Sequence, residues 1–295
     1  MKKYITVFAT LTLFFISCQK EISVENGTNP TPTPSLTDTI LLRKFIVLDT
    51  TQTAPNDTIY MYNYYYDNLK RCTLIKFNDY QNSSIGYTYN YYSTTDTIIS
   101  SRKLINQVYS DSVIEYFTYT VNGQMLSDSV LEYNSSGLHT TVYKYQSTNN
   151  TITSTITSNG QPLIIGKYLV TKDNSGNTIS ENDSSFKYIS GAYMYSSNSN
   201  ILNTYDTKSC PFYKIYPKRV VDLDYELVAV DDIPFYGFLQ KNNTKTKKQT
   251  TLPTTSGLRD INVTFQYIYN SNNYPTSVLY KDLLFGDAYK GVYYY

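Results

Sequence analysis

Large apolar side chains recur at every second position in many short stretches of this chain. The clearest case lies between residues 59 and 77, where four tyrosines alternate with other residues: Tyr60, Tyr62, Tyr64 and Tyr66. An extended backbone places such alternate positions on one face of a strand. The polar pair Asp67-Asn68 follows, and a second apolar run returns after it. The stretch therefore predicts a β-hairpin, because the pattern has the period of a strand and not of a helix.

The same plan recurs about every 26 residues along the chain. Outgoing strands end at large side chains that serve as landmarks: Tyr66, Tyr91, Tyr119, Tyr145 and Val170. Polar turn residues follow each landmark: Asp67-Asn68, Thr95-Asp96, Asn122-Gly123, Asn149-Asn150 and Asn174-Ser175-Gly176. Asn and Gly accept a positive φ angle, and Asn-Gly between apolar strands is a strong hairpin signal. Each period is therefore one predicted hairpin.

The remaining strands follow the same rhythm. Two further ladders of large side chains each share one strand face: Ile85, Tyr87, Tyr89 and Tyr91, and Val263, Phe265, Tyr267 and Tyr269. We expect a first strand over residues 41–48 and a meander with strands over 113–121, 124–133, 138–145, 151–157 and 162–171. The predicted fold class is all-β, a single antiparallel meander of repeated hairpins over residues 40–295, forming a barrel-like or strongly curved sheet.

The rhythm breaks between about residues 205 and 260, which predicts an elaboration of the sheet. Residues 220–230 still alternate, with Asp222, Asp224 and Glu226 on one face. Residues 231–237 and 241–248 are interpreted as an exposed excursion that includes a helical turn.

The N-terminus carries a targeting signal. A basic start, an apolar run over residues 5–16 and the pair Ser17-Cys18 are typical of a secretory signal peptide, over residues 1–17. The sequence around Ser17-Cys18 resembles the bacterial lipobox, in which the cysteine is lipidated; a cleaved signal with an incidental Cys18 is the alternative. Residues 18–39 alternate Thr and Pro in part, which favours an extended tether. The chain is therefore expected in the outer membrane, lipid-anchored, on its periplasmic or cell-surface side.

Charge and composition exclude several classes of protein. The formal net charge of +1 gives no field that would attract nucleic acid. The only histidine, His139, has no partner at ligand spacing, so histidine-dependent triads and typical zinc sites are not expected. No motif indicates a catalytic residue, a metal or a cofactor.

Two charged clusters have structural alternatives. Asp222, Asp224 and Glu226, with Asp231 and Asp232, offer oxygen ligands for Ca²⁺, but their spacing matches no calcium loop and the solvated face of a strand is preferred. Four lysines lie close together without interleaved aromatic residues, which favours a solvated loop over a nucleic-acid site: Lys241, Lys245, Lys247 and Lys248.

Lipidation of Cys18 would leave two cysteines, Cys72 and Cys210. They form either a disulfide between the first hairpin and the excursion, or two buried thiols.

The chain resembles a family of Bacteroidetes-type lipoproteins whose Tyr-rich hairpins are similar to YD repeats and whose fold is a porin-like β structure. The matching units are YNYYYDNLKRCTLIKF, FTYTVNGQMLSDSVLEYNSSG and FQYIYNSNNYPTSVLYKD, together with DDIPFYGFLQKNN. The last unit is similar to the family's Asn-Pro-Phe-x-Gly loop, with Ile233 in place of the first Asn. The resemblance implies no activity, cofactor or catalytic residue.

The tyrosine ladders admit three interpretations: the core face of a sheet, an exposed surface that stacks on glycans or peptides, or the wall of a membrane barrel. The leading hypothesis is a non-enzymatic lipoprotein of the cell envelope that binds a glycan or protein partner or serves a structural role. The alternatives are a glycan-directed envelope hydrolase and a membrane-embedded β-barrel.

Overall fold

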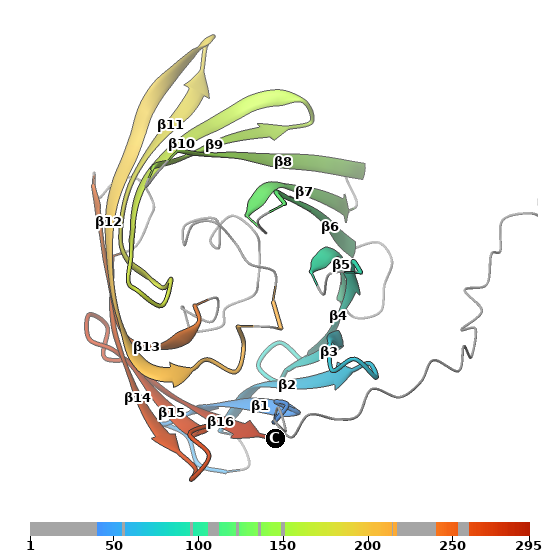
Figure 1. Ribbon diagram of the computed structural model, residues 1–295, viewed down its shortest axis with the longest axis vertical. Helices are drawn as coiled ribbons and strands as arrows, with labels where there is room; N and C mark the ends of the chain where they lie inside the picture. Colours follow the sequence, from blue (N-terminus) through green and yellow to red (C-terminus); the bar gives the residue numbers. More distant parts are fainter. Residues whose placement is uncertain are drawn as a thin grey trace, which may run out of the picture. The chain divides into compact units, whose positions relative to one another are not determined.

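Sixteen antiparallel strands make up the part of the chain that the computed structural model describes (Figure 1), which is residues 40–54, 57–94, 97–105, 112–121, 124–134, 137–148, 151–213, 215–216, 240–252 and 260–295. The first eight are β1 (Lys44–Asp49), β2 (Thr58–Tyr66), β3 (Cys72–Asp79), β4 (Ser84–Tyr92), β5 (Ile98–Ile105), β6 (Ser112–Tyr119), β7 (Met125–Asn134) and β8 (Gly137–Thr148). The others are β9 (Thr151–Ser158), β10 (Gln161–Lys172), β11 (Thr178–Ile189), β12 (Ala192–Ser209), β13 (Asn242–Leu252), β14 (Ile261–Tyr269), β15 (Pro275–Asp282) and β16 (Ala288–Tyr294). Within these ranges, no helix has the length and hydrophobicity needed to cross a membrane.

The sheet is closed. Each strand pairs with the strands before and after it in sequence, and β1 pairs with β16 from Lys44↔Tyr294 to Asp49↔Tyr289. Closure gives every strand a neighbour on both sides, so the barrel exposes no unpaired edge. The predicted all-β antiparallel meander is confirmed, and of the two predicted shapes the structure has the barrel.

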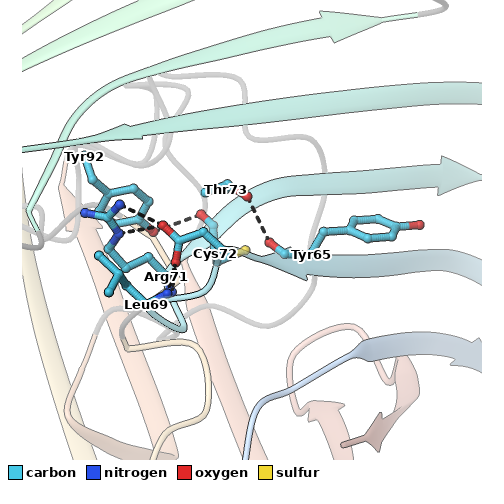
Figure 2. A network of polar contacts seen from close by, with 7 residues as sticks. Tyr65, Leu69, Arg71, Cys72, Thr73 and Tyr92 are labelled. Carbon is cyan, nitrogen blue, oxygen red and sulfur yellow. Dashed lines mark hydrogen bonds and ion pairs between the residues drawn. The ribbon is translucent and has the colours of Figure 1, made fainter. Parts of the chain in front are cut away.

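Five-residue turns close several hairpins at one end of the barrel. In the β2–β3 turn, one carboxylate oxygen of Asp67 accepts hydrogen bonds from the backbone N–H groups of Leu69 and Arg71 at 2.9 and 3.0 Å (Figure 2). The Arg71 guanidinium holds the other oxygen at 2.7–2.8 Å. Burial alone would raise the pKa of Asp67, but these bonds from Arg71 outweigh it and hold that pKa below its usual value. Lys70 adopts a φ of 63°.

The same turn recurs elsewhere. Asp173 and Asn270 occupy the place of Asp67 in the β10–β11 and β14–β15 turns, and each accepts two backbone N–H bonds. Gly176 and Asn273 supply the positive φ at the fourth position. An Asp or Asn first and a residue that tolerates positive φ fourth are therefore the local code for these hairpins.

A second contact recurs near the ends of five strands. A tyrosine there donates its hydroxyl to a backbone carbonyl beside or in the preceding strand, at 2.7–3.0 Å: Tyr66 to Leu42, Tyr92 to Cys72, Tyr119 to Ile98, Tyr205 to Thr178 and Tyr295 to Pro275. These hydrogen bonds join adjacent hairpins beyond the backbone ladder. The landmark of the second hairpin is thus Tyr92 and not Tyr91, which is 51% exposed.

Buried and exposed side chains alternate along the strands. A closed wall can cover only its inner face, so the buried positions point inward. On β2 these are Tyr60, Tyr62 and Tyr64. Two buried clusters result. One joins β1–β3 and β14–β16 and includes Phe45 and Tyr293, and the other joins β5–β10.

The predicted excursion is too long. β12 continues to Ser209, with register shifts after Thr204 and Tyr205, and β13 begins at Asn242 and pairs with both β12 and β14. Residues 242–248 are therefore part of a strand and not of an exposed loop with a helical turn. Residues 220–230, including the acidic positions predicted there, lie outside the described residues.

Candidate functional site

The interior of the barrel is filled on one side by aromatic side chains. After β12 the chain turns to the inside of the ring (Figure 1), and Phe212 packs there against the rings of Phe45, Tyr293 and Tyr64, with centroid distances of 5.1, 5.7 and 6.3 Å. Asn90 of β4 donates a hydrogen bond to the Ile215 carbonyl at 3.4 Å, which ties this segment to the wall. This side of the interior is therefore a packed core.

Acidic residues also point inward. Six are buried on the inner face of the wall: Asp79, Glu115, Asp128, Glu181, Asp183 and Asp282. Ser101 donates to Glu115 at 3.1 Å, and Ser199 donates to Asp183 at 2.9 Å. Burying a carboxylate without such partners is costly, which explains the hydroxyl groups beside them.

Two further polar atoms face the interior on β13. The Gln249 side-chain nitrogen and the Thr251 hydroxyl are buried, and neither has a hydrogen-bond partner in the structure. Thr251 lies opposite Ser199 in the register, so these donors adjoin the Asp183–Ser199 pair. A water molecule or a small polar ligand would satisfy them.

The outer face of the wall has the opposite character. Seven lysines lie there at mid-strand or near strand ends: Lys44, Lys76, Lys144, Lys167, Lys248, Lys281 and Lys290. Hydroxyl and amide side chains fill many of the other outward positions; on β9 all four are Thr, at residues 151, 153, 155 and 157. These lysines place ammonium groups on the outer face, whereas the six buried carboxylates lie on the inner one; Lys247 of β13 is a lysine buried inside.

Exposed apolar side chains interrupt this polar character on several strands, for example Leu169, Leu202 and Ile268, and β2–β6 carry the set that is richest in tyrosine. On β4 the ladder Ile85, Tyr87, Tyr89 and Tyr91 points outward, as the buried Gly86 and Asn90 between its members show. In the register, Tyr89 lies beside Leu74 of β3, which lies beside Tyr65 of β2. We call the outward-facing set on β2–β6 the aromatic face; four of its members are exposed and four are half-buried: Tyr65, Ile85, Tyr91 and Tyr116, and Leu74, Tyr87, Tyr89 and Ile114.

The two predicted cysteines are both buried, free thiols in the structure, and no disulfide joins them. Burial raises the pKa of Cys72 and of Cys210 to about 12. Both thiols are therefore protonated at neutral pH and act as core side chains, although they belong to the same aromatic cluster.

His139 lies on β8 opposite Glu132 of β7. Over the part of the chain that the structure describes, no three His, Cys, Asp or Glu side chains gather in a way that would hold a metal ion. The lysine cluster was interpreted wrongly as a loop: Lys245, Lys247 and Lys248 belong to β13, and Lys247 is buried on its inner face. The hydrogen bond between Asp183 of β11 and Ser199 of β12 was not predicted, because no local signal in the sequence shows which face of a strand points inward.

The predicted lipidation site Cys18, the signal peptide and the tether lie outside the described residues. Asp222, Asp224, Glu226, Asp231 and Asp232 lie outside them too.

Comparisons with known proteins give structural neighbours only. No protein-family model and no curated protein matches the chain. The chain is similar to a crystal structure of a porin-like protein from Bacteroides vulgatus, with 11% identity and a TM-score of 0.48 over 86% of this chain and 98% of that one. It is also similar to a porin-like protein from Bacteroides uniformis, with 11% identity and a TM-score of 0.45 over 86% of this chain and 96% of that one.

Proposed function

We propose that this chain is a lipid-anchored barrel of the outer membrane that acts by binding and not by catalysis, and whose wall stands mainly in water. The orientation of the charged side chains carries the proposal. A lipid-facing lysine costs about 2–4 kcal/mol near the middle of a bilayer. Lys76 on β3, Lys248 on β13 and Lys281 on β15 all point outward from the wall.

A lipid anchor would attach the barrel to the membrane, since a wall with outward lysines does not insert into the lipid by itself. Lipidation of Cys18 would place acyl chains at one end of a Thr/Pro-containing tether, and that tether leads into β1. Each buried CH₂ contributes about 0.8 kcal/mol, so a chain with several acyl groups stays on the membrane. The barrel would then stand on the periplasmic or the cell-surface side.

A binding role agrees with the chemistry of the interior. Two of the inward carboxylates, Glu115 and Asp183, accept hydrogen bonds from serines, and the exposed turns and outer wall offer surfaces for a glycan or a protein.

A membrane-embedded barrel is the second candidate. A closed antiparallel meander with an even number of strands and tight turns at one end is the architecture of outer-membrane barrels. Exposed apolar side chains such as Ile268, Leu202 and Tyr91 also occur on the outer wall.

Cutting the tether separates the two candidates. A protease site is inserted between Pro34 and Ser35 of the full chain, membranes that hold the protein are treated with the protease, and they are then washed with concentrated salt at neutral pH, where the barrel stays folded. A lipid-anchored barrel is released, whereas an uncut control stays with the membrane. Retention of the cut barrel would overturn the proposal and favour the embedded barrel.

A further inference from the structure

We infer that the aromatic face is the surface by which the barrel rests on a phospholipid membrane. The inference rests on the proposed function, because a wall embedded in lipid all round would have no special side. The occupant is the headgroup layer of the membrane that holds the lipid anchor, and four observations favour it.

The first observation is the chemistry of the face. Tyr65, Tyr91 and Tyr116 are 47–51% exposed, and the Tyr87 and Tyr89 rings stack with centroids 6.5 Å apart. Tyrosine is enriched where a protein meets the membrane surface, since its ring enters the apolar boundary while its hydroxyl stays in water. A row of tyrosine rings therefore suits the headgroup layer of a membrane, which has acyl chains on one side and water on the other.

The second observation is contrast with the rest of the wall. Asn200 on β12 points outward and lies between Asn182 of β11 and Thr250 of β13 in the register. Tyr89, at the equivalent position of its own strand, lies between Leu74 and Arg102. At this level of the wall the outward residues are therefore aromatic, aliphatic or basic on β3–β5 and carry amides or hydroxyls on β11–β13, although Leu202 of β12 and Leu252 of β13 are exposed as well.

The third observation is charge. Lys44, Lys76 and Arg102 lie on the outer face of β1, β3 and β5, and no acidic side chain occupies a described outward position of β1–β6. The Lys76 ammonium lies 6.0 Å from the centre of the Tyr87 ring. A basic, acid-free surface is attracted to anionic headgroups, and the rings add apolar contact.

The fourth observation is where the tether ends. The chain enters the wall at Leu42 and Arg43, where the Leu42 carbonyl accepts a bond from Tyr66, and the Arg43 carbonyl accepts one from the Tyr64 N–H at 2.9 Å. Tyr65 of the aromatic face lies between those two tyrosines in sequence. The chain therefore enters the wall beside the aromatic face.

The tether also makes a weak contact sufficient. Residues 18–39 reach about 70 Å when fully extended as polyproline, so the anchored barrel stays within that distance of the membrane surface. Tethering makes the contact intramolecular, and a surface of low intrinsic affinity is then occupied most of the time.

The chain has no tryptophan, so a single introduced tryptophan reports from one position. We compare Tyr89→Trp, at the centre of the aromatic face, with Asn200→Trp on the polar side. Each full-length, lipidated variant is placed in vesicles of phosphatidylcholine and phosphatidylglycerol with or without bromine-labelled acyl chains, which quench nearby tryptophan. The far-UV circular dichroism of both variants must match that of the parent chain.

The inference predicts quenching and a blue shift of emission at position 89 only. It further predicts that Lys76→Glu in the Tyr89→Trp background reduces the quenching on anionic vesicles but not on neutral ones. Quenching at neither position would overturn the inference and leave the proposed function standing, with a barrel held away from the membrane. Quenching at both positions would overturn both, because it would show a wall surrounded by lipid.

Discussion

The buried ionisable groups predict that the barrel loses stability steeply in alkali. Burial holds the pKa of Tyr64 and Tyr293 well above the usual value of 10. It also raises the pKa of Cys72 and Cys210 from 9 to about 12. The folded state therefore keeps these four protons, which the unfolded chain gives up, and burial raises the pKa of five further tyrosines in the same direction: Tyr66, Tyr92, Tyr267, Tyr269 and Tyr295. Their stabilising contribution is complete below pH 9 and falls as the pH rises, because stability decreases wherever the unfolded state binds fewer protons.

The size of the loss follows from the same shifts. One proton retained over one pH unit corresponds to about 1.4 kcal/mol. At a pH of about 11 the two thiols account for about 5 kcal/mol and the two tyrosines for about 3 kcal/mol, a total of about 8 kcal/mol. This is close to the whole stability of an ordinary domain, about 5–15 kcal/mol. We therefore expect the barrel to unfold near pH 11.

Tyrosinate absorbance and far-UV circular dichroism, followed together, measure this. The buried tyrosines should ionise only as the strand signal disappears. Tyr64→Phe should lessen the slope of the unfolding free energy with pH by about 1.4 kcal/mol per unit. If all tyrosines ionise along one curve near pH 10 with the strand signal intact, the inward assignment is wrong.

Two matched pairs of substitutions test the packing of the wall by urea unfolding. Tyr119→Phe removes a hydrogen bond between hairpins and should destabilise the barrel by about 1 kcal/mol, whereas Tyr116→Phe, on the outer face, should not; equal effects would contradict the role given to the repeated tyrosines. Gly291→Ala should cost about 1–3 kcal/mol, because its Cβ would lie 2.7 Å from the Phe45 ring. Gly86→Ala meets its nearest atom at 3.4 Å and should change stability by less than about 0.5 kcal/mol. The reverse order would show that the interior is not packed as described.

Strands and turns could be predicted because their code is local. The five strands expected between residues 113 and 171 correspond to β6–β10, with ends shifted by only a few residues. Apolar residues at every second position specify a strand, and Asn or Gly between two such stretches specifies the turn at which the chain reverses direction. Both signals lie within a few residues of the structure they specify.

The inside and the outside of the wall could not be predicted. The ladders on β2 and β4 look alike in sequence, yet Tyr62 points inward and Tyr87 points outward. The reason lies on neighbouring strands. Phe77 of β3 packs on Tyr62 at 4.9 Å and lies over Gly86 of β4, so the inner space beside β4 is already filled. Only the pairing register of β2, β3 and β4 shows which of the two tyrosine ladders points inward.

The polar strand β13 was missed for a related reason. Its sequence, NNTKTKKQTTL, has one large apolar residue, Leu252. A strand is expected to show an apolar face, but the inner face here meets the carboxylates and hydroxyls of β11 and β12. Lys247, Gln249 and Thr251 are therefore buried in a polar part of the interior.

Reactivity of single cysteines tests most directly which face of the wall meets water. The native thiols, Cys72 and Cys210, are buried and protonated, so in the folded protein the maleimide reacts with the added thiol and not with them. Asn200→Cys and Ser199→Cys place it on the outer and the inner face of the same strand. In open outer-membrane fragments, a membrane-impermeant maleimide should label position 200 promptly and position 199 only after unfolding. Protection of position 200 until detergent is added, or faster labelling of position 199, would contradict a water-facing polar wall.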